Sequence, residues 1–257
     1  MDWSKTKTIF IVTFLILNLF LTWQLVETNH ANKISPMTEA TIQERLNQNN
    51  VTIEVELPEE EIEGLHVIGK RAPLSGRNVS SFTNQKAEII DEQIIVSILN
   101  KPFVVDPKKM QVSLSSFLSM YVFKGSEYRF GRYEADSGRI FFYQTYDGKT
   151  AYTLDDEPLI LQLNDEFQIV GYKQSYFEFE ELEGRERQIL SSLKALEVLL
   201  NEQLIKMNDT ITNVEFGYYS FFSPQGDVQV FAPMWRVIVG NHTYLVNAIE
   251  GTVQQLA

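Results

Sequence analysis

The sequence has 257 residues with 44% hydrophobic and 12% aromatic content, enough for one large or two small globular cores and too much for a disordered chain. It contains no cysteine, which excludes a disulfide scaffold, a thiol nucleophile and a cysteine-bound zinc site. The net charge of −12 would repel nucleic acid and anionic polymers, so nucleic acid is excluded as an expected partner.

The first predicted element is an apolar helix over Ile9–Val26, which contains no charged residue. At about 1.5 Å per residue it spans roughly 27 Å, close to the hydrocarbon thickness of a bilayer. A cleaved signal has a shorter apolar core and small residues at its cleavage site, whereas this helix exits through the bulky Trp23. Lys5 and Lys7 precede it, which favours a cytoplasmic tail over residues 1–8. The sequence therefore predicts a single-pass signal anchor over 9–26 in the cell membrane, in contact with lipid, with the remainder extracytoplasmic.

Two polar residues lie inside this anchor. Asn18 and Thr22 are four residues apart and share a helix face with Ile11, Phe14 and Leu15. Interhelical hydrogen bonds in lipid contribute on the order of 0.6–2 kcal/mol, and intramembrane polar residues are functional candidates by default. We interpret these five residues as a transmembrane interaction face. The alternative, that the asparagine is merely tolerated, stays open.

Residues 27–104 are predicted to form the N-terminal part of the extracytoplasmic region. Ser35-Pro36 begins a short helical pattern that ends near Asn49-Asn50, because proline is tolerated in a first turn. Val51–Leu57 alternates as a half-buried strand does, and Lys86–Leu99 reads as a hairpin that turns at Asp91-Glu92.

Residues 105–182 are predicted to form a first helix-plus-sheet unit. Asp106 supplies an N-cap and Pro107 a first turn for a helix that Gly125 ends. Strands follow in the segments EYRFGRY, RIFFYQTY, KTAYTL, LILQL and FQIVGYKQ, to about Phe179. The apolar face of the helix is expected to hold Met110, Leu114, Phe117, Leu118, Tyr121 and Val122.

Residues 183–257 are predicted to form a second such unit. It begins with the longest helix after the anchor, over about Glu186–Met207, and continues with the strands TNVEFGYYSFF, DVQVFAPMWRVIV and HTYLVNAI. Pro233 predicts a bulged or edge strand, with Trp235 in the core. The apolar stripe of the helix is interpreted as core packing, with a partner-docking face as the alternative: Ile189, Leu193, Leu196, Leu200 and Leu204.

The last two thirds of the chain contain a repeated Phe-Gly-X-Tyr pattern. In each predicted unit the pattern opens the first strand after the helix. This common place predicts an internal duplication and an α+β fold, with helices packed on antiparallel sheets. The residues are Phe130, Gly131 and Tyr133 in the first unit, and Phe216, Gly217 and Tyr219 in the second.

The sequence offers no motif for chemistry. The three histidines, His30, His66 and His242, lack HExxH spacing, and no GxSxG, P-loop or GxGxxG pattern is present. The acidic runs Glu59–Glu61 and Asp155–Glu157 are interpreted as solvated loops, because neither has the alternating ligands of a calcium loop. We therefore assign no catalytic, cofactor-binding or metal-binding residue, expect no cofactor, and expect that the protein is not an enzyme.

Four segments resemble the YycI (WalI) family of Gram-positive bacteria: MDWSKTKTIFIVTFLILNLFL, FGYY, VFAPMWRV and YLVNAIEG. The resemblance implies a non-enzymatic single-pass membrane protein with an α+β exterior similar to part of its companion, YycH. It also implies association with the sensor kinase WalK (YycG), partly through transmembrane helices. WalK and its response regulator WalR (YycF) control cell-wall metabolism. The sign of the effect on the kinase is not implied.

Two other functions stay open. The first is a sensor whose exterior binds a peptide or a wall fragment, and the second, less favoured, is a wall-active hydrolase with two carboxylates that meet only in space. The sequence also leaves open whether the extracytoplasmic region forms a dimer.

Overall fold

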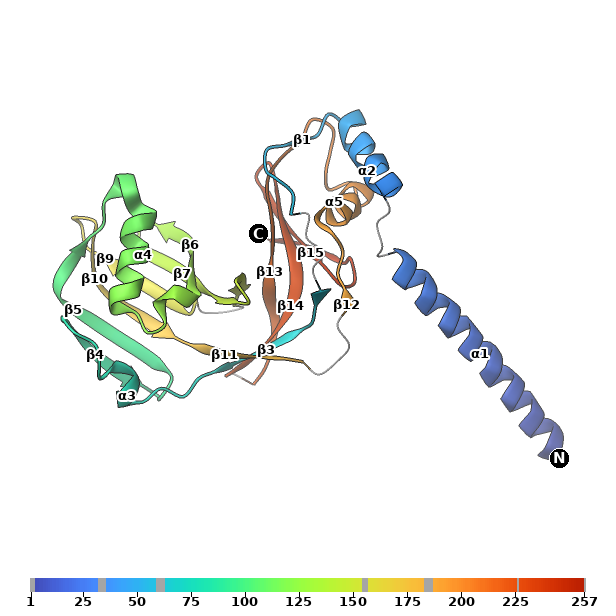
Figure 1. Ribbon diagram of the computed structural model, residues 1–257, viewed down its shortest axis with the longest axis horizontal. Helices are drawn as coiled ribbons and strands as arrows, with labels where there is room; N and C mark the ends of the chain where they lie inside the picture. Colours follow the sequence, from blue (N-terminus) through green and yellow to red (C-terminus); the bar gives the residue numbers. More distant parts are fainter. Residues whose placement is uncertain are drawn as a thin grey trace. The chain divides into compact units, whose positions relative to one another are not determined.

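The computed structural model describes residues 3–31, 36–58, 63–153, 157–182, 187–225 and 227–256 (Figure 1). The helices are α1 Trp3–Ala31, α2 Pro36–Gln48, α3 Gly76–Val79, α4 Met110–Tyr121 and α5 Ser192–Asn201, with short 3₁₀ turns η1 Pro107–Lys109 and η2 Gly125–Glu127. The strands are β1 Thr52–Ile53, β2 Glu63–Gly64, β3 Val67–Arg71, β4 Gln85–Ile90, β5 Ile94–Val104, β6 Tyr128–Glu134, β7 Arg139–Tyr146, β8 Lys149–Tyr152, β9 Leu159–Leu163, β10 Gln168–Ser175, β11 Phe177–Glu181, β12 Arg187–Gln188, β13 Thr210–Gln225, β14 Val228–Val239, β15 His242–Asn247 and β16 Val253–Leu256.

The chain divides into two compact units that are discontinuous in sequence. Unit 1 contains residues 1–63, 188–214 and 237–257, and unit 2 contains residues 64–187 and 215–236. The strands β13 and β14 each contribute residues to both units. The units therefore do not follow the boundaries at 104 and 182 that we placed from the sequence.

Unit 2 is built on an extended mixed sheet. Its strand order is β11-β3-β14-β13-β8-β7-β9-β10-β5-β4, and β6 pairs with β7. The pairings from β7 through β9, β10 and β5 to β4 are antiparallel. The pairing of β13 with β8 is parallel, with Gly217 opposite Thr150. The fold is thus α+β with a large, mostly antiparallel sheet, as the sequence predicts.

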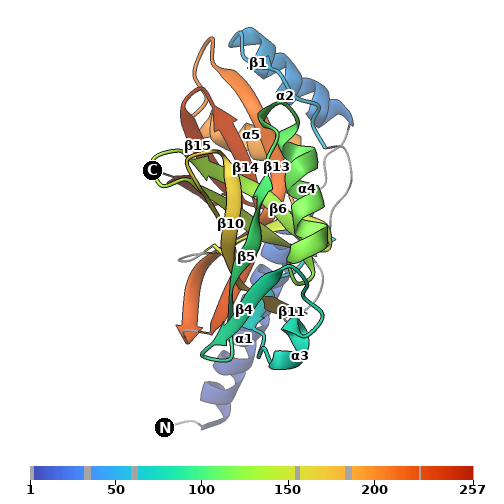
Figure 2. The same cartoon turned by 90° about the vertical axis from the view of Figure 1, so that its left-hand side faces the viewer.

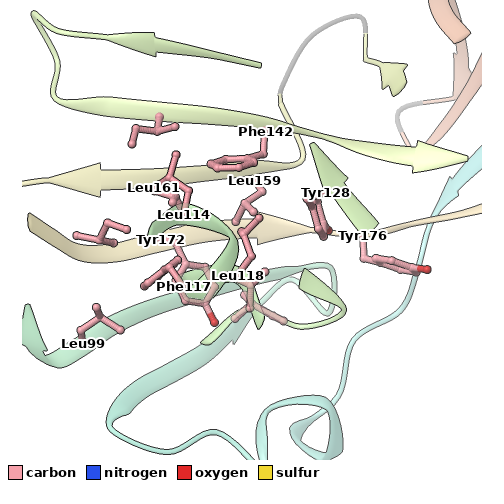
Figure 3. Packing of buried hydrophobic residues seen from close by; sticks show 14 of the residues in the cluster. Leu99, Leu114, Phe117, Leu118, Tyr128, Phe142, Leu159, Leu161, Tyr172 and Tyr176 are labelled. Carbon is pink, nitrogen blue, oxygen red and sulfur yellow. The ribbon is translucent and has the colours of Figure 1, made fainter. Parts of the chain in front are cut away.

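The helix α4 covers one face of β7, β9, β10 and β5 (Figures 1 and 3). The predicted apolar face is confirmed, because Leu114, Phe117, Leu118 and Val122 are buried while Met110 and Tyr121 are partly buried. Phe117 lies at the centre of this core, with its ring 5.4 Å from Phe103, 5.1 Å from Tyr121 and 6.1 Å from Tyr172. Burial of such apolar surface is the main stabilising term of the fold.

Unit 1 places α2 against α5 (Figure 1). Arg45 of α2 donates to Asn201 at 2.8 Å and pairs with Glu197 at 3.3 Å, both on α5. Apolar side chains beneath both helices are fully buried, including Ile42, Leu196 and Leu199. In this unit β1 pairs in parallel with the start of β13, with Thr52 opposite Thr210.

The helix predicted over 186–207 is shorter than its apolar pattern suggests. Ser191 caps α5 by accepting from the Lys194 amide at 3.2 Å, and the helix ends at Asn201. Gln203 then adopts a φ of 59°, which turns the chain out of the helix. This helix is therefore shorter than α1, α2 and α4, and Ile189 and Leu204 lie outside it.

Two further expectations need correction. The strand predicted over Val51–Leu57 is limited to Thr52–Ile53, because only these two residues pair with β13. Gly125 does not end α4, which ends four residues earlier at Tyr121. A Cβ at Gly125 would lie 2.0 Å from the Leu118 carbonyl oxygen, so glycine is required there by close packing.

Each copy of the repeated pattern follows a helix, but the two copies occupy different environments. In β6, Phe130 is 45% exposed and Tyr133 is 39% exposed. In β13, Phe216 and Tyr219 are 5% and 6% exposed, and the Phe216 ring packs edge-on against Trp235. Trp235 is fully buried, as predicted, and Pro233 lies just beyond the last pair that joins β14 to β3, at Phe231. The internal duplication itself stays a prediction.

The predicted hairpin is confirmed as β4 and β5, and its turn predicts a stabilising substitution. Asp91 and Glu92 have φ values of 50° and 56°, a conformation that costs an L-residue roughly 1 kcal/mol and glycine almost nothing. Glu92→Gly is therefore expected to raise the free energy of unfolding by about 1 kcal/mol in urea titration. The control Glu88→Gly, inside β4, should lower it by about 1 kcal/mol. If both variants changed the free energy of unfolding in the same direction, the interpretation of a strained turn would be wrong.

Candidate functional site

The first candidate surface is one side of α1. Phe10, Ile11, Phe14, Leu15 and Asn18 line a shallow hollow on this helix. Four of these five belong to the predicted interaction face, and Thr22 lies one turn further along. The four apolar residues that line it are 56–74% exposed. These residues thus lie on one side of α1, and the interaction face stays a prediction.

Asn18 has a partner within its own helix. Its Nδ2 atom donates to the Phe14 carbonyl at 2.9 Å. An asparagine amide carries two N–H donors and one acceptor oxygen, so this bond uses only part of its capacity. An intermolecular partner would therefore contribute toward the lower end of the expected range, about 0.6 kcal/mol.

The described part of α1 does not by itself establish a membrane span. Among the residues that the structure describes, no helix combines the length and apolarity required to cross a membrane.

The second candidate surface, the stripe around α5, is divided by the structure. Leu196 is fully buried beneath the helix, and Ile189 is 5% exposed in the segment before it. Leu193 and Leu200 are half-buried, as is Leu204 beyond the helix end. The buried side of α5 is instead formed by Ser192, Ala195, Leu196 and Leu199. The five residues therefore do not present one exposed face, and Ser191 was the N-cap signal that could have placed the helix correctly.

A polar cluster holds the chain where α4 passes into β6. Lys124 has a φ of 48°, and its Nζ donates to the Tyr176 hydroxyl at 2.8 Å. Tyr176 donates in turn to the Glu127 carboxylate at 2.6 Å. The hydrogen bond to Tyr176 raises the pKa of Lys124, and burial raises the pKa of Tyr176. Both groups thus stay protonated near neutral pH, unlike a general base, whose pKa lies near 7.

Neither histidine with a described side chain belongs to a reactive constellation. His66 lies between β2 and β3, where its carbonyl accepts from the Leu182 amide, and His242 Nδ1 lies 3.1 Å from Gln255 Nε2. No group of three or more His, Asp or Glu side chains within the described residues could hold a metal ion. The acidic run Glu59–Glu61 lies outside the described residues, as do Asp155 and Asp156.

Buried tyrosines predict a loss of stability at alkaline pH. Burial raises the pKa of Tyr172 and Tyr218 to about 12, and the pKa of Tyr128 and Tyr219 still further. A tyrosine whose pKa is higher in the folded state than in the unfolded state stabilises the fold, and the full contribution is present below the unfolded-state pKa of about 10. This contribution is lost as the pH rises from about 10 through the folded-state pKa.

The free energy of unfolding should therefore be constant, as far as these groups determine it, from about pH 7 to 9 and should fall steeply between about pH 10 and 12. Urea titrations combined with tyrosinate absorbance would measure it. Tyr218→Phe removes one of the titrating groups and should make the decline shallower. A decline that begins below about pH 9 would have another cause.

The fold defines a class of protein: an α+β chain built on a large, mostly antiparallel sheet. A family model described as YycI protein matches residues 29–249. The chain belongs to the YycI family.

Two solved structures are similar to the chain at low identity. One is an uncharacterized protein from Eubacterium rectale, with 10% identity, a TM-score of 0.43, and coverage of 80% of this chain and 86% of that one. The other is YycH from Bacillus subtilis, with 11% identity, a TM-score of 0.38, and coverage of 78% of this chain and 53% of that one. The chain thus corresponds to about half the length of that YycH. No curated protein matched.

Proposed function

We propose that this protein is a non-enzymatic, membrane-anchored regulator of a WalK (YycG)-like sensor histidine kinase, acting together with a YycH-like protein. The observation that carries the proposal is the family match over residues 29–249, which supports a role in the WalK regulatory system. The match covers residues of both compact units and begins after the apolar stretch Ile9–Val26, so it supports the role of the folded region, and the part played by α1 is a further step of the proposal.

The proposal places α1 in the cell membrane with its N-terminus in the cytoplasm and residues 27–257 outside. The 29-residue helix is roughly 44 Å long, more than the hydrocarbon core requires. Its described side chains from Ile9 to Leu21 are apolar except Thr13 and Asn18, and they are exposed. Trp3 and Trp23 stand near the two ends, where aromatic rings settle at an interface. Lys7 lies on the N-terminal side of the apolar stretch, which favours an orientation with the N-terminus in the cytoplasm.

The mechanism follows from the shape of the α1 face. A neighbouring helix approaches α1 at the hollow that Asn18 lines together with Phe14 and Leu15. The Asn18 amide then forms a hydrogen bond with that helix. If the kinase helices have two arrangements, α1 favours the one that fits this face. A few kcal/mol of differential binding is enough to shift such an equilibrium substantially.

Exchange of the anchor tests this proposal. Residues 1–26 would be replaced by an unrelated single-pass anchor of the same orientation, and wall-regulon transcription would be measured in cells that lack the native copy. We expect the exchanged protein to lose most of its effect on transcription while it stays at normal abundance. A second variant keeps residues 1–31 and lacks the folded region. It shows how much the folded region contributes to the effect on wall-regulon transcription. Unchanged transcription with both variants would contradict the proposal.

A further inference from the structure

The strand β6 lies at one end of the part of the sheet that α4 covers. From this end the strand order is β6-β7-β9-β10-β5-β4, and among the described strands β6 pairs with β7 alone. Figures 1 and 2 show β6 beside α4. The outer edge of β6 therefore presents backbone N–H and C=O groups that no described strand uses. An extended segment of another molecule can add to such an edge as a further strand.

Two aromatic side chains of β6 are left half-exposed at this edge. Phe130 lies opposite Phe142 and packs edge-on against its ring at 6.0 Å, and Tyr133 lies opposite Ile140. A β-bulge between Phe130 and Arg132 places both aromatic residues on the side of the α4 core, to which Phe142 and Ile140 belong. Phe130 is nevertheless 45% exposed and Tyr133 39% exposed. The core thus ends at β6 with apolar surface that an added strand would cover.

The second copy of the Phe-Gly-X-Tyr pattern shows the effect of two neighbouring strands. β13 lies between β14 and β8 in the sheet. The Phe216 ring packs against Trp235 of β14 at 5.3 Å, and the Tyr219 ring stacks on Tyr152 of β8 at 4.2 Å. Phe216 and Tyr219 are buried by these contacts. The same residue types on β6 stay exposed because one neighbouring strand covers them instead of two.

The other side of β6 carries the charges that select an occupant. Arg129 and Arg132 are exposed there, on the side away from α4. Arg132 pairs with Glu157, whereas Arg129 has no ion-pair partner among the described side chains. Together with Glu134, this side of β6 has two bases and one acid, in a chain whose net charge is −12. Acidic side chains on the matching side of an added strand would lie next to Arg129.

We propose that β6 binds an extended segment of another protein as an additional strand, with apolar residues of the segment on Phe130 and Tyr133 and acidic residues beside Arg129. β6 has seven residues, so the paired part of the segment is about five to seven residues long. Backbone hydrogen bonds supply the affinity, and the alternation of apolar and acidic side chains supplies the specificity. The proposal goes beyond the kinase contact of α1 and does not depend on it, because β6 lies in unit 2.

The test is the binding of a fluorescent heptapeptide that alternates valine and glutamate to the full-length protein in detergent, measured by anisotropy. We expect saturable binding that is at least about tenfold tighter than for a peptide of the same composition in two blocks, or for one that alternates valine and lysine. Hydrogen exchange should slow over residues 128–134 in the complex, because outer amides of β6 become bonded. Residues 85–90, the strand β4 at the other end of the sheet, should not change.

Substitutions on β6 locate the contact. Phe130→Lys places a charge beneath the apolar side of the added strand and should weaken binding at least about tenfold. Val112→Lys is the matched control: Val112 is 65% exposed, but it lies on α4, and this variant should bind normally. Arg129→Glu should reverse the charge preference, so that the valine–lysine peptide binds more tightly than the valine–glutamate peptide.

Five results would overturn the proposal: no binding by the wild type, equal binding of the block peptide, slowed exchange over 85–90 instead of 128–134, equal effects of Phe130→Lys and Val112→Lys, or an unchanged charge preference in Arg129→Glu. None of these variants alters α1. Because wall-regulon transcription is measured separately in the anchor exchange, failure of strand addition and failure of the kinase role are distinguishable.

Discussion

Phe117→Ala is expected to lower the free energy of unfolding of unit 2 by about 3–5 kcal/mol. The Phe117 side chain is fully buried, and its ring contacts the rings of Phe103, Tyr121 and Tyr172. Its removal loses the transfer free energy of the ring and leaves a cavity between α4 and the sheet (Figure 3), which close-packed neighbours fill only in part.

Trp235 provides the measurement, because it is fully buried in unit 2 while Trp3 and Trp23 lie on α1. In a Trp3→Phe/Trp23→Phe background Trp235 is the one remaining tryptophan, so its fluorescence in a urea titration follows the unfolding of the buried strand β14. The matched control is Phe130→Ala, which removes the same ring from a site that is 45% exposed and should cost about 1 kcal/mol or less. Similar losses for both variants would show that the α4 core is not the main source of stability.

The second large effect is expected at Gly125. Its missing Cβ position lies 2.0 Å from the carbonyl oxygen of Leu118, which accepts the Val122 amide at 3.2 Å and so closes the end of α4. Gly125→Ala must displace this backbone, and we expect a loss of about 3 kcal/mol or more.

Gly76→Ala is the control, for which we expect no loss in the free energy of unfolding. A Cβ at Gly76 would meet no atom within 4 Å, and the residue lies in the short helix α3. The substitution should be neutral or should stabilise by up to about 1 kcal/mol, because alanine loses less backbone entropy on folding. Both variants can be followed by Trp235 fluorescence. A tolerated Gly125→Ala would mean that the end of α4 shifts at little cost.

Local signals explain what the sequence predicted well. The hairpin at Asp91-Glu92 and the apolar face of α4 depend on turns and periodicity within about a dozen residues, and the structure confirms both. The end of the second helix was misplaced because Leu200 and Leu204 continue the apolar spacing. The left-handed turn at Gln203 has no comparable signal in the sequence.

Long-range pairing could not be predicted in the same way. The parallel contact of β8 with β13 joins Thr150 to Gly217, which no local pattern links. Helical spacing places Ile11, Phe14 and Asn18 on one side of α1, but it does not predict the hydrogen bond from Asn18 to the Phe14 carbonyl.

The central claim is that the Asn18 face of α1 contacts the kinase and sets its output. Because the chain has no cysteine, single cysteines from Ile9 to Trp23 can be scanned for cross-links to the transmembrane helices of the WalK-like kinase in native membranes. The variant Asn18→Leu/Ile16→Asn moves the amide by about 200°, to the opposite side of the helix, with nearly unchanged composition. We predict cross-links that peak at Ile11, Phe14, Leu15, Asn18 and Thr22, and altered wall-regulon transcription in the variant. Cross-links that are absent or uniform around the helix, with transcription unchanged, would contradict the claim and leave α1 as a tether.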